Sequence, residues 1–174
     1  MLRIDGLRLP RSIPAKYVRL IVACTESSSL LRIKPDQVIA HRKSLARERE
    51  SYLGEIEHRG DIFLDPDTGI ATSKCKQIKK YIRANELAAL MTAAPGRVIA
   101  VYQHVRAVKA CVRVDGCLAV AAKGVAPFTW CSYESPTVAM LFLSRDPDRI
   151  LAIEKTLKGL LGRHATGRVR NGSK

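Results

Sequence analysis

Acidic residues are scarce in this sequence, and their scarcity excludes a neutral, weakly charged protein. The 174 residues include 30 Lys and Arg but only 16 Asp and Glu, which gives a formal net charge of +14 and a pI near 10.0. An excess of this size implies a polyanionic partner, most simply nucleic acid, with an anionic membrane surface as the weaker alternative. Charge alone leaves open a ribosomal or simply basic protein.

The cysteines lack the spacing of a metal or redox motif. Five are present, but no CxxC pair occurs, and no two stand with His at zinc-finger spacing. A scattered, odd-numbered set predicts reduced thiols in a cytoplasmic protein. Cys24, Cys111 and Cys131 lie in or beside apolar segments, so we expect them to be buried and unpaired.

Long apolar runs are absent too. No segment reaches membrane-spanning length, and residues 1–14, MLRIDGLRLPRSIP, lack the continuous apolar core of a signal peptide. The sequence therefore predicts a soluble, cytoplasmic protein with no membrane partner. Its composition favours no particular oligomeric state.

The order of apolar and polar segments predicts one α/β domain over residues 1–162. The segment ELAALMTAA, which stops at Pro95-Gly96, predicts a helix between two apolar runs, 61–65 and 97–104, and this connection favours parallel pairing. The runs are continuous rather than alternating, as in strands that are covered on both faces. We therefore expect a Rossmann-like open, mostly parallel sheet with helices on both faces.

Further elements are expected around this unit. A strand at 16–24 and a helix at 35–58 precede it. Residues 105–124 favour a helix followed by a short irregular segment, with a hairpin turn at Asp115-Gly116 as the alternative. The remaining segments predict an antiparallel strand pair around Ser135-Pro136 at one sheet edge, a helix opened by Asp146 and Pro147, and a disordered basic tail at 163–174.

Polar residues follow the two apolar runs that this unit pairs. The first run ends in the turn DPDTG (65–69), and the second ends in YQH (102–104). Because ligands of open parallel sheets lie beyond the carboxyl ends of the strands, we expect two carboxylates, an amide and an imidazole to converge there. Between the runs comes a segment of five cations without an acid, Lys74, Lys76, Lys79, Lys80 and Arg83.

These residue types suit chemistry on nucleic acid. Asp65 and Asp67 would hold Mg²⁺ or Mn²⁺, and His104 would act as general base or position a water. Phosphate would be contacted by the cations, and Gly69 would let the backbone turn tightly or a phosphate approach. The expected nucleic-acid contacts are Lys74, Lys76, Lys79, Lys80, Arg83 and Gln103. The alternative is an ordinary Asp-Pro-Asp-x-Gly turn beside a solvated basic face.

The segments IFLDPDTGI, KKYI, NELAAL and VIAVYQH resemble a poorly characterised family of bacterial and phage-borne proteins. In that family an apolar strand ending D-P-D-[N/T]-G leads to a basic stretch, a helix and a strand ending Y-Q-H. The resemblance covers about residues 60–105. More remotely, the arrangement is similar to Rossmann-like nucleic-acid methyltransferases, which implies S-adenosylmethionine as cofactor. However, Asp67 and Thr68 replace the second proline and the aromatic residue of their D-P-P-[Y/F] motif, and no glycine-rich loop follows the first strand.

Three functions remain as hypotheses. The preferred one is metal-dependent, nuclease-like phosphodiester chemistry at Asp65, Asp67 and His104. The alternatives are a methyltransferase-like enzyme and a non-enzymatic DNA- or RNA-binding protein, which would need nothing from those three residues. A scaffold or inhibitor of another protein is a further class that a short basic chain allows.

Overall fold

The structure is a computed structural model of the chain, and it describes part of the sequence. The described residues are 3–4, 7–8, 53–54, 60–66, 68–72, 75, 80–125 and 127–174. The chain divides into two compact units, residues 1–40 and 41–174. In the first, β1 (Arg3–Ile4) pairs antiparallel with β2 (Leu7–Arg8). The strand expected at 16–24 and most of the helix expected at 35–58 lie outside the described residues.

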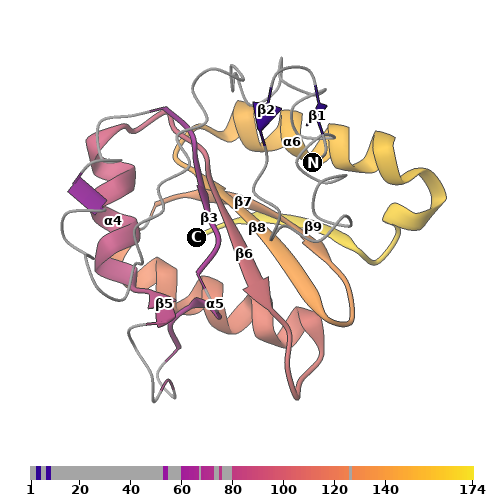
Figure 1. Cartoon of the computed structure of the whole chain (residues 1–174), viewed down its shortest axis with the longest axis horizontal. Helices are drawn as coiled ribbons and strands as arrows, with labels where there is room; N and C mark the ends of the chain where they lie inside the picture. Colours follow the sequence, from indigo (N-terminus) through magenta and orange to yellow (C-terminus); the bar gives the residue numbers. More distant parts are fainter. Residues whose placement is uncertain are drawn as a thin grey trace. The chain divides into compact units, whose positions relative to one another are not determined.

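A five-stranded sheet forms the centre of the second unit (Figure 1). Its strands β3 and β6 run parallel, and the other neighbouring pairs run antiparallel. The strand order is β3 (Ile62–Leu64), β6 (Ile99–His104), β8 (Val138–Ser144), β7 (Thr129–Glu134) and β9 (Val169–Ser173). The expected mostly parallel sheet is therefore wrong: the sheet is mixed and mostly antiparallel, and a Rossmann-like fold is not confirmed.

The local part of the strand prediction is confirmed. A helix, α4 (Ala84–Ala93), lies in the connection between the parallel strands β3 and β6. The antiparallel pair around Ser135-Pro136 is β7 and β8, but β8 lies in the interior of the sheet rather than at its edge. A separate two-stranded parallel ladder joins β4 (Gly69–Ile70) to β5 (Tyr81–Ile82).

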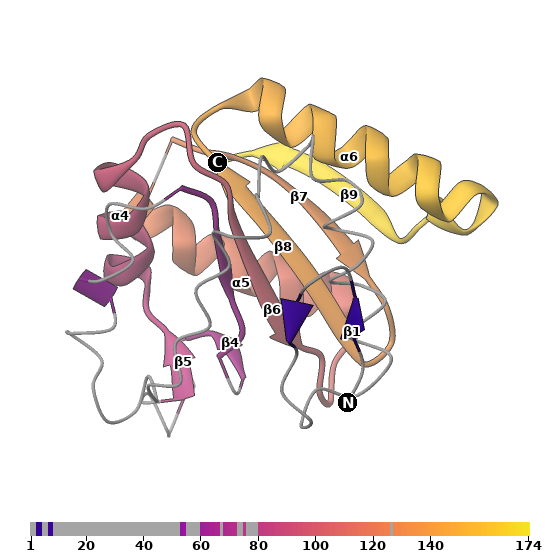
Figure 2. The ribbon, with the colours of Figure 1, turned by 45° about the horizontal axis from the view of Figure 1, so that its top comes forward.

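Helices cover both faces of the sheet, as expected, with α5 (Ala110–Val125) on one side and α6 (Pro147–Leu161) on the other (Figure 2). Consecutive residues of β9 show this directly, because successive side chains of a strand point to opposite faces. Arg170 bonds Asp115 of α5, whereas Asn171 bonds Glu154 of α6. The helix α5 runs continuously through Asp115 and Gly116, so neither the hairpin turn nor the irregular segment forms.

The core lies between the sheet and the helices α4 and α5. Side chains of β6 and β8 are fully buried there against Leu87 and Leu90 of α4 and Leu118 of α5. Burial of each such aliphatic side chain is worth about 1.5–3 kcal/mol. This core fixes the carboxyl ends of β3 and β6, where polar residues follow the strands.

The C-terminal tail, expected to be disordered, is ordered. Its residues form β9, which pairs antiparallel with β7 along the edge of the sheet. The tail folds because its polar side chains find buried partners: Arg170 bonds Glu134 and Asn171 bonds Glu154. At Gly172 a Cβ atom would lie 3.1 Å from the Trp130 ring, so any larger residue would require this ring to shift by a few tenths of an ångström.

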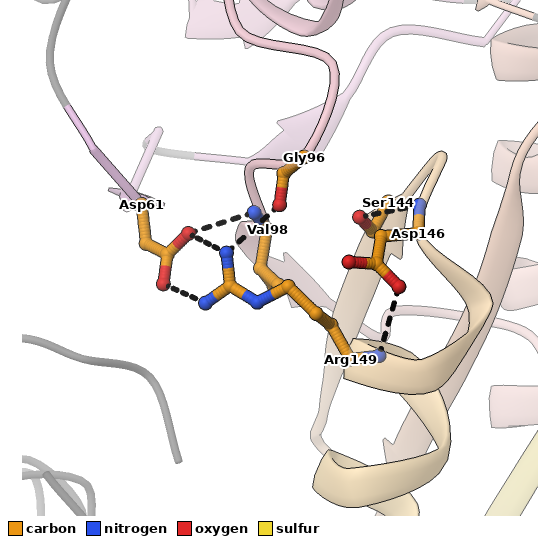
Figure 3. A network of polar contacts seen from close by, with 6 residues as sticks. All are labelled: Asp61, Gly96, Val98, Ser144, Asp146 and Arg149. Carbon is orange, nitrogen blue, oxygen red and sulfur yellow. Dashed lines mark hydrogen bonds and ion pairs between the residues drawn. The ribbon is translucent and has the colours of Figure 1, made fainter. Parts of the chain in front are cut away.

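An ion-pair network joins α6 to the amino end of β3 (Figure 3). The Arg149 guanidinium donates to the Asp61 carboxylate and to the carbonyl oxygen of Gly96, at 2.8 Å each. The same carboxylate accepts the backbone N–H of Val98 at 2.9 Å. Asp146 caps α6 by accepting from the backbone N–H groups of its first turn. Through these contacts the Asp61 carboxylate stabilises the fold.

The described helices are those of a globular α/β unit. None of them combines the length and the apolar character that crossing a membrane requires.

Candidate nucleic-acid interface

The parallel strands β3 and β6 end at the same edge of the sheet. Their register pairs Leu64 with Val101, so Asp65 follows β3 at the level where Tyr102 and His104 complete β6. Because side chains alternate along a strand and both Leu64 and Val101 belong to the core, Asp65, Tyr102 and His104 share the opposite face. Asp65 is exposed and His104 is half-buried. The His104 ring stands edge-on to Tyr102, with the ring centroids 5.1 Å apart.

Gln103 points to the other face and is only 2% exposed. Its Oε1 accepts the backbone N–H of Ile70 at 2.8 Å, and its Nε2 donates to the carbonyl oxygen of Thr68 at 2.8 Å. The side-chain amide thus pairs with the loop after β3 as a neighbouring strand would. Gln103, expected among the nucleic-acid contacts, is engaged inside the fold, so we leave it out of the proposed interface.

Gly69 is required where this loop passes Gln103. A Cβ atom at this position would lie 2.1 Å from the Gln103 Oε1, and the backbone has a φ of +100°, which only glycine adopts without strain. The lack of a side chain at Gly69 therefore admits the amide of Gln103. The turn DPDTG and the strand end YQH form one structural unit, which gives the spacing of the two motifs a physical reason.

The thiol of Cys117 also forms a hydrogen bond with the side-chain amide of Gln103. Its Sγ donates to the Gln103 Oε1 at 3.2 Å, and burial raises the pKa of Cys117 to about 12. A thiol in this state is protonated at neutral pH and is a hydrogen-bond donor rather than a nucleophile. On the loop itself, the backbone N–H of Thr72 donates to the Cys75 Sγ at 3.1 Å.

The remaining predicted site residues are only partly described. Asp67, Lys74, Lys76 and Lys79 lie outside the described residues. Lys80 is exposed, and its carbonyl oxygen accepts the Thr68 hydroxyl at 2.8 Å. Arg83 is half-buried, and its backbone N–H donates to the Glu86 carboxylate at 2.8 Å, which caps the start of α4.

The metal-site prediction gains nothing from the described side chains. Within these residues, no three His, Cys, Asp or Glu side chains gather into a group that could hold an ion. Asp65 and His104 share a face, but the second expected carboxylate, Asp67, is not among the residues described.

Two cations that the sequence analysis missed lie at the same edge. Arg106 and Lys109 are exposed on the loop that follows β6, and the carbonyl oxygen of Arg106 accepts a hydrogen bond from Arg113 of α5. Their signal in the sequence is the absence of any acid between Glu86 and Asp115, a stretch that contains Arg97, Arg106, Lys109 and Arg113.

Most of the described carboxylates are engaged in ion pairs or helix caps. Asp61 binds Arg149, Glu154 binds Lys158, and both Glu134 and Asp115 bind Arg170. Glu86 and Asp146 cap helices. Burial works against the charge of Arg170, but its hydrogen bond to Glu134 and the nearby Asp115 outweigh this, so its pKa is raised. Among the described residues, these six carboxylates are therefore already engaged.

Comparison of the chain with protein-family models, with curated proteins and with solved structures found no match. The family resemblance at residues 60–105 accordingly stays a prediction. Function has to be argued from the charges and the geometry of the chain itself.

Proposed function

We propose that this protein binds nucleic acid through contacts with the phosphate backbone. One observation carries the proposal: the fold uses most of its described carboxylates for ion pairs and helix caps, while several cations stay exposed, namely Lys80, Arg106, Lys109, Lys155, Arg163 and Arg168. A surface with unbalanced positive charge attracts a polyanion and releases its counterions on binding.

The edge at the ends of β3 and β6 is the first surface that fits this function. Lys80, Arg106 and Lys109 are exposed there, and within the described residues neither Arg106 nor Lys109 makes an ion pair. Three further cations follow in the sequence between β4 and β5, namely Lys74, Lys76 and Lys79. Phosphate groups would serve as counterions to these cations.

Base stacking is not needed for this mode of binding. Trp130 and Phe128 are 6% and 2% exposed, so these two rings serve the packing of the fold, whereas Phe63 of β3 is 48% exposed. Proteins that bind single strands without sequence preference combine a positively charged groove with exposed aromatic side chains on which bases stack. We propose that phosphate contacts dominate binding and that affinity depends weakly on base sequence, because phosphate contacts carry no sequence information.

The test compares three labelled ligands of one base sequence: a single-stranded oligonucleotide, its duplex, and a peptide nucleic acid with an uncharged backbone. Fluorescence anisotropy should show binding of the two phosphate-containing ligands and none of the uncharged one. Equal binding of all three would contradict a phosphate-based function. Absence of binding to any ligand would contradict nucleic-acid binding altogether.

Metal-dependent phosphodiester chemistry is the second candidate function. Its support is the placement of Asp65 and His104 on one face at the ends of parallel strands, with Asp67 two residues further on. Asp65 and Asp67 would hold the divalent ion, which would polarise a phosphate oxygen when bound. His104 would accept a proton from the attacking water.

Thermal unfolding tests this second candidate with Asp65→Asn, Asp67→Asn and a control, Asp148→Asn, each with and without Mn²⁺ and an oligonucleotide. Asn makes the same turn hydrogen bonds but loses the charge. If the metal binds, wild type and the control are stabilised by Mn²⁺, and the two site variants are not. No shift of wild type at millimolar Mn²⁺ would contradict the metal site.

We do not propose the methyltransferase-like alternative. The sheet is not mostly parallel, and residues 23–30, ACTESSSL, contain no glycine for a cofactor loop.

A further inference from the structure

We propose that the end of the C-terminal helix and the turn that follows form a second phosphate-binding surface, the C-terminal basic corner. The corner is defined by Lys155, Lys158, Arg163 and Arg168. The inference rests on the proposed function, because it assigns part of the nucleic-acid contact to residues far along the chain from the edge at β3 and β6.

The turn between α6 and β9 holds this corner in a defined shape. Gly162 ends α6 with a φ of +52°, and its N–H donates to the carbonyl oxygen of Lys158. Gly167 has a φ of +70°, and the N–H of Arg168 bonds the carbonyl oxygen of Ala165 at 2.9 Å. Figure 2 shows α6 and β9 side by side, joined by this turn. Arg163 and Arg168 are therefore held on one tight connection.

The cations of this region divide into two groups according to the fold. Arg170 points inward, where it bonds Glu134 and Asp115 and lies 5.7 Å from the centre of the Trp130 ring. Residues 155–174 contain six Lys and Arg and no acid. Lys158 pairs with Glu154, but within the described residues Lys155, Arg163 and Arg168 are exposed and make no ion pair. In the part of the chain that the structure describes, Arg170 has partners inside the fold, whereas these three cations are exposed and have no ion-pair partner.

Strand addition by a second copy of the chain fits this edge poorly. β9 is the last strand of the sheet, and its pairing with β7 uses the backbone groups of Arg168, Arg170, Gly172 and Lys174. A second β9 added antiparallel about Asn171 would place Arg168 opposite Lys174. Like charges opposite each other disfavour such pairing, and cations on an edge strand are a common protection against it.

A membrane surface fits the corner poorly as well. Binding of a helix in a bilayer interface needs apolar side chains gathered on one face. The exposed large apolar residues of α6 are Leu151 and Leu160, which are 61% and 63% exposed. They stand nine residues apart, about 180° around an α-helix, so they form no common face. The observations favour a soluble polyanion.

The experiment removes two outward cations of the corner with Arg163→Gln/Arg168→Gln. The matched control, Lys123→Gln/Arg145→Gln, removes two exposed cations elsewhere and leaves the same net charge. Binding of a labelled duplex is measured over a salt series. The corner variant should bind roughly 3- to 10-fold more weakly at low salt, with a log–log salt slope smaller by about 1–2, since each duplex phosphate contact contributes about 0.9. The control should lose clearly less.

Each outcome decides the proposal. Equal losses in the two double variants would overturn the corner and leave the proposed function standing, whereas failure of wild type to bind any oligonucleotide would contradict that function itself. A loss confined to binding of phosphatidylserine vesicles would also overturn the proposal. Duplex binding by Lys155→Gln is a second test of the corner. Because Gln and Lys have similar helix propensities, this change should leave α6 intact. Normal binding by both the corner variant and Lys155→Gln would overturn it too.

Discussion

The Oε1 atom of Gln103, in the strand β6, accepts a hydrogen bond of 2.8 Å from the backbone N–H of Ile70, just beyond the turn that follows β3. The Gln103 Nε2 atom also donates to the carbonyl oxygen of Thr68. The side-chain amide thus makes the two hydrogen bonds that a neighbouring strand would make. The polar residue at the strand end therefore fixes the turn from inside the fold, and the surface edge is left to Asp65, His104 and the surrounding cations.

Replacement of this amide should be costly. Gln103→Ala leaves buried polar groups of Thr68 and Ile70 without partners, so we expect a loss of about 2–3 kcal/mol in the free energy of unfolding. Gly69→Ala should cost a similar amount, because its Cβ would overlap the amide and its φ of +100° is strained. In the double variant the clash is gone, so its loss should fall short of the sum by about 1 kcal/mol or more.

Urea unfolding of the two single variants and the double variant measures this coupling. Asn85→Ala, which removes an exposed amide at the start of α4, is the control and should change stability little. Additive losses would show that Gly69 and Gln103 do not share the close contact described here.

Arg149 should couple strongly to Asp61. The Asp61 side chain is only 8% exposed, so Arg149→Ala leaves a buried carboxylate without its cation, at a cost of about 2–4 kcal/mol. Asp61→Asn/Arg149→Ala should lose less than the two single variants together. Arg145→Ala, which removes an exposed cation next to α6, should be nearly neutral. A double-mutant cycle in urea checks this, and a coupling near zero would contradict the network.

Glu154 should make stability depend on pH. The hydrogen bond from Lys158 holds the pKa of Glu154 below its ordinary value of 4.5 although burial opposes this, and Asn171 adds a second bond. A group with a lowered folded pKa stabilises the fold above its unfolded pKa and ceases to do so as pH falls through the folded one. Glu154→Gln should therefore be less stable than wild type at pH 7, and the difference should disappear in acid. A difference that stays constant from pH 7 to pH 3 would contradict this, and Lys155→Gln serves as the neighbouring control.

The described cysteines should react in a fixed order. Burial raises the pKa of Cys117 and of Cys131 to about 12, so neither forms appreciable thiolate at pH 8. Cys75 and Cys111 are half-buried and should be alkylated first. The expected burial is thus confirmed for Cys131 and only partial for Cys111, while Cys24 lies outside the described residues. Peptide mass spectrometry after timed alkylation gives the order, and early labelling of Cys117 would contradict the packing around Gln103.

The sequence predicts the parts of this fold that depend on local signals. The parallel unit of β3, α4 and β6 follows from two apolar runs and a helix stopped at Pro95-Gly96. The central place of β8 between β6 and β7 could not be predicted, because a continuous apolar run indicates burial on both faces and not the direction of its neighbours. The order of the tail depends on Arg170 and Glu134, which stand 36 residues apart.

The candidate site, like the fold, could be predicted from the sequence only in part. The sequence correctly brings the ends of β3 and β6 to one edge, but it groups Gln103 with Tyr102 and His104. A strand turns successive side chains to opposite faces, so this middle residue had to point away from its two neighbours. That alternation was available in the sequence. The partner of the amide was not, since Ile70 lies 33 residues away.

The dependence of affinity on salt shows whether phosphate contacts dominate binding. Wild-type protein is titrated into a labelled oligonucleotide at several salt concentrations, and the logarithm of the association constant is plotted against that of the salt concentration. If phosphate contacts by the exposed cations dominate, affinity should fall steeply, with a slope of several units. A flat response, or no binding at low salt, would contradict binding of nucleic acid through its phosphates.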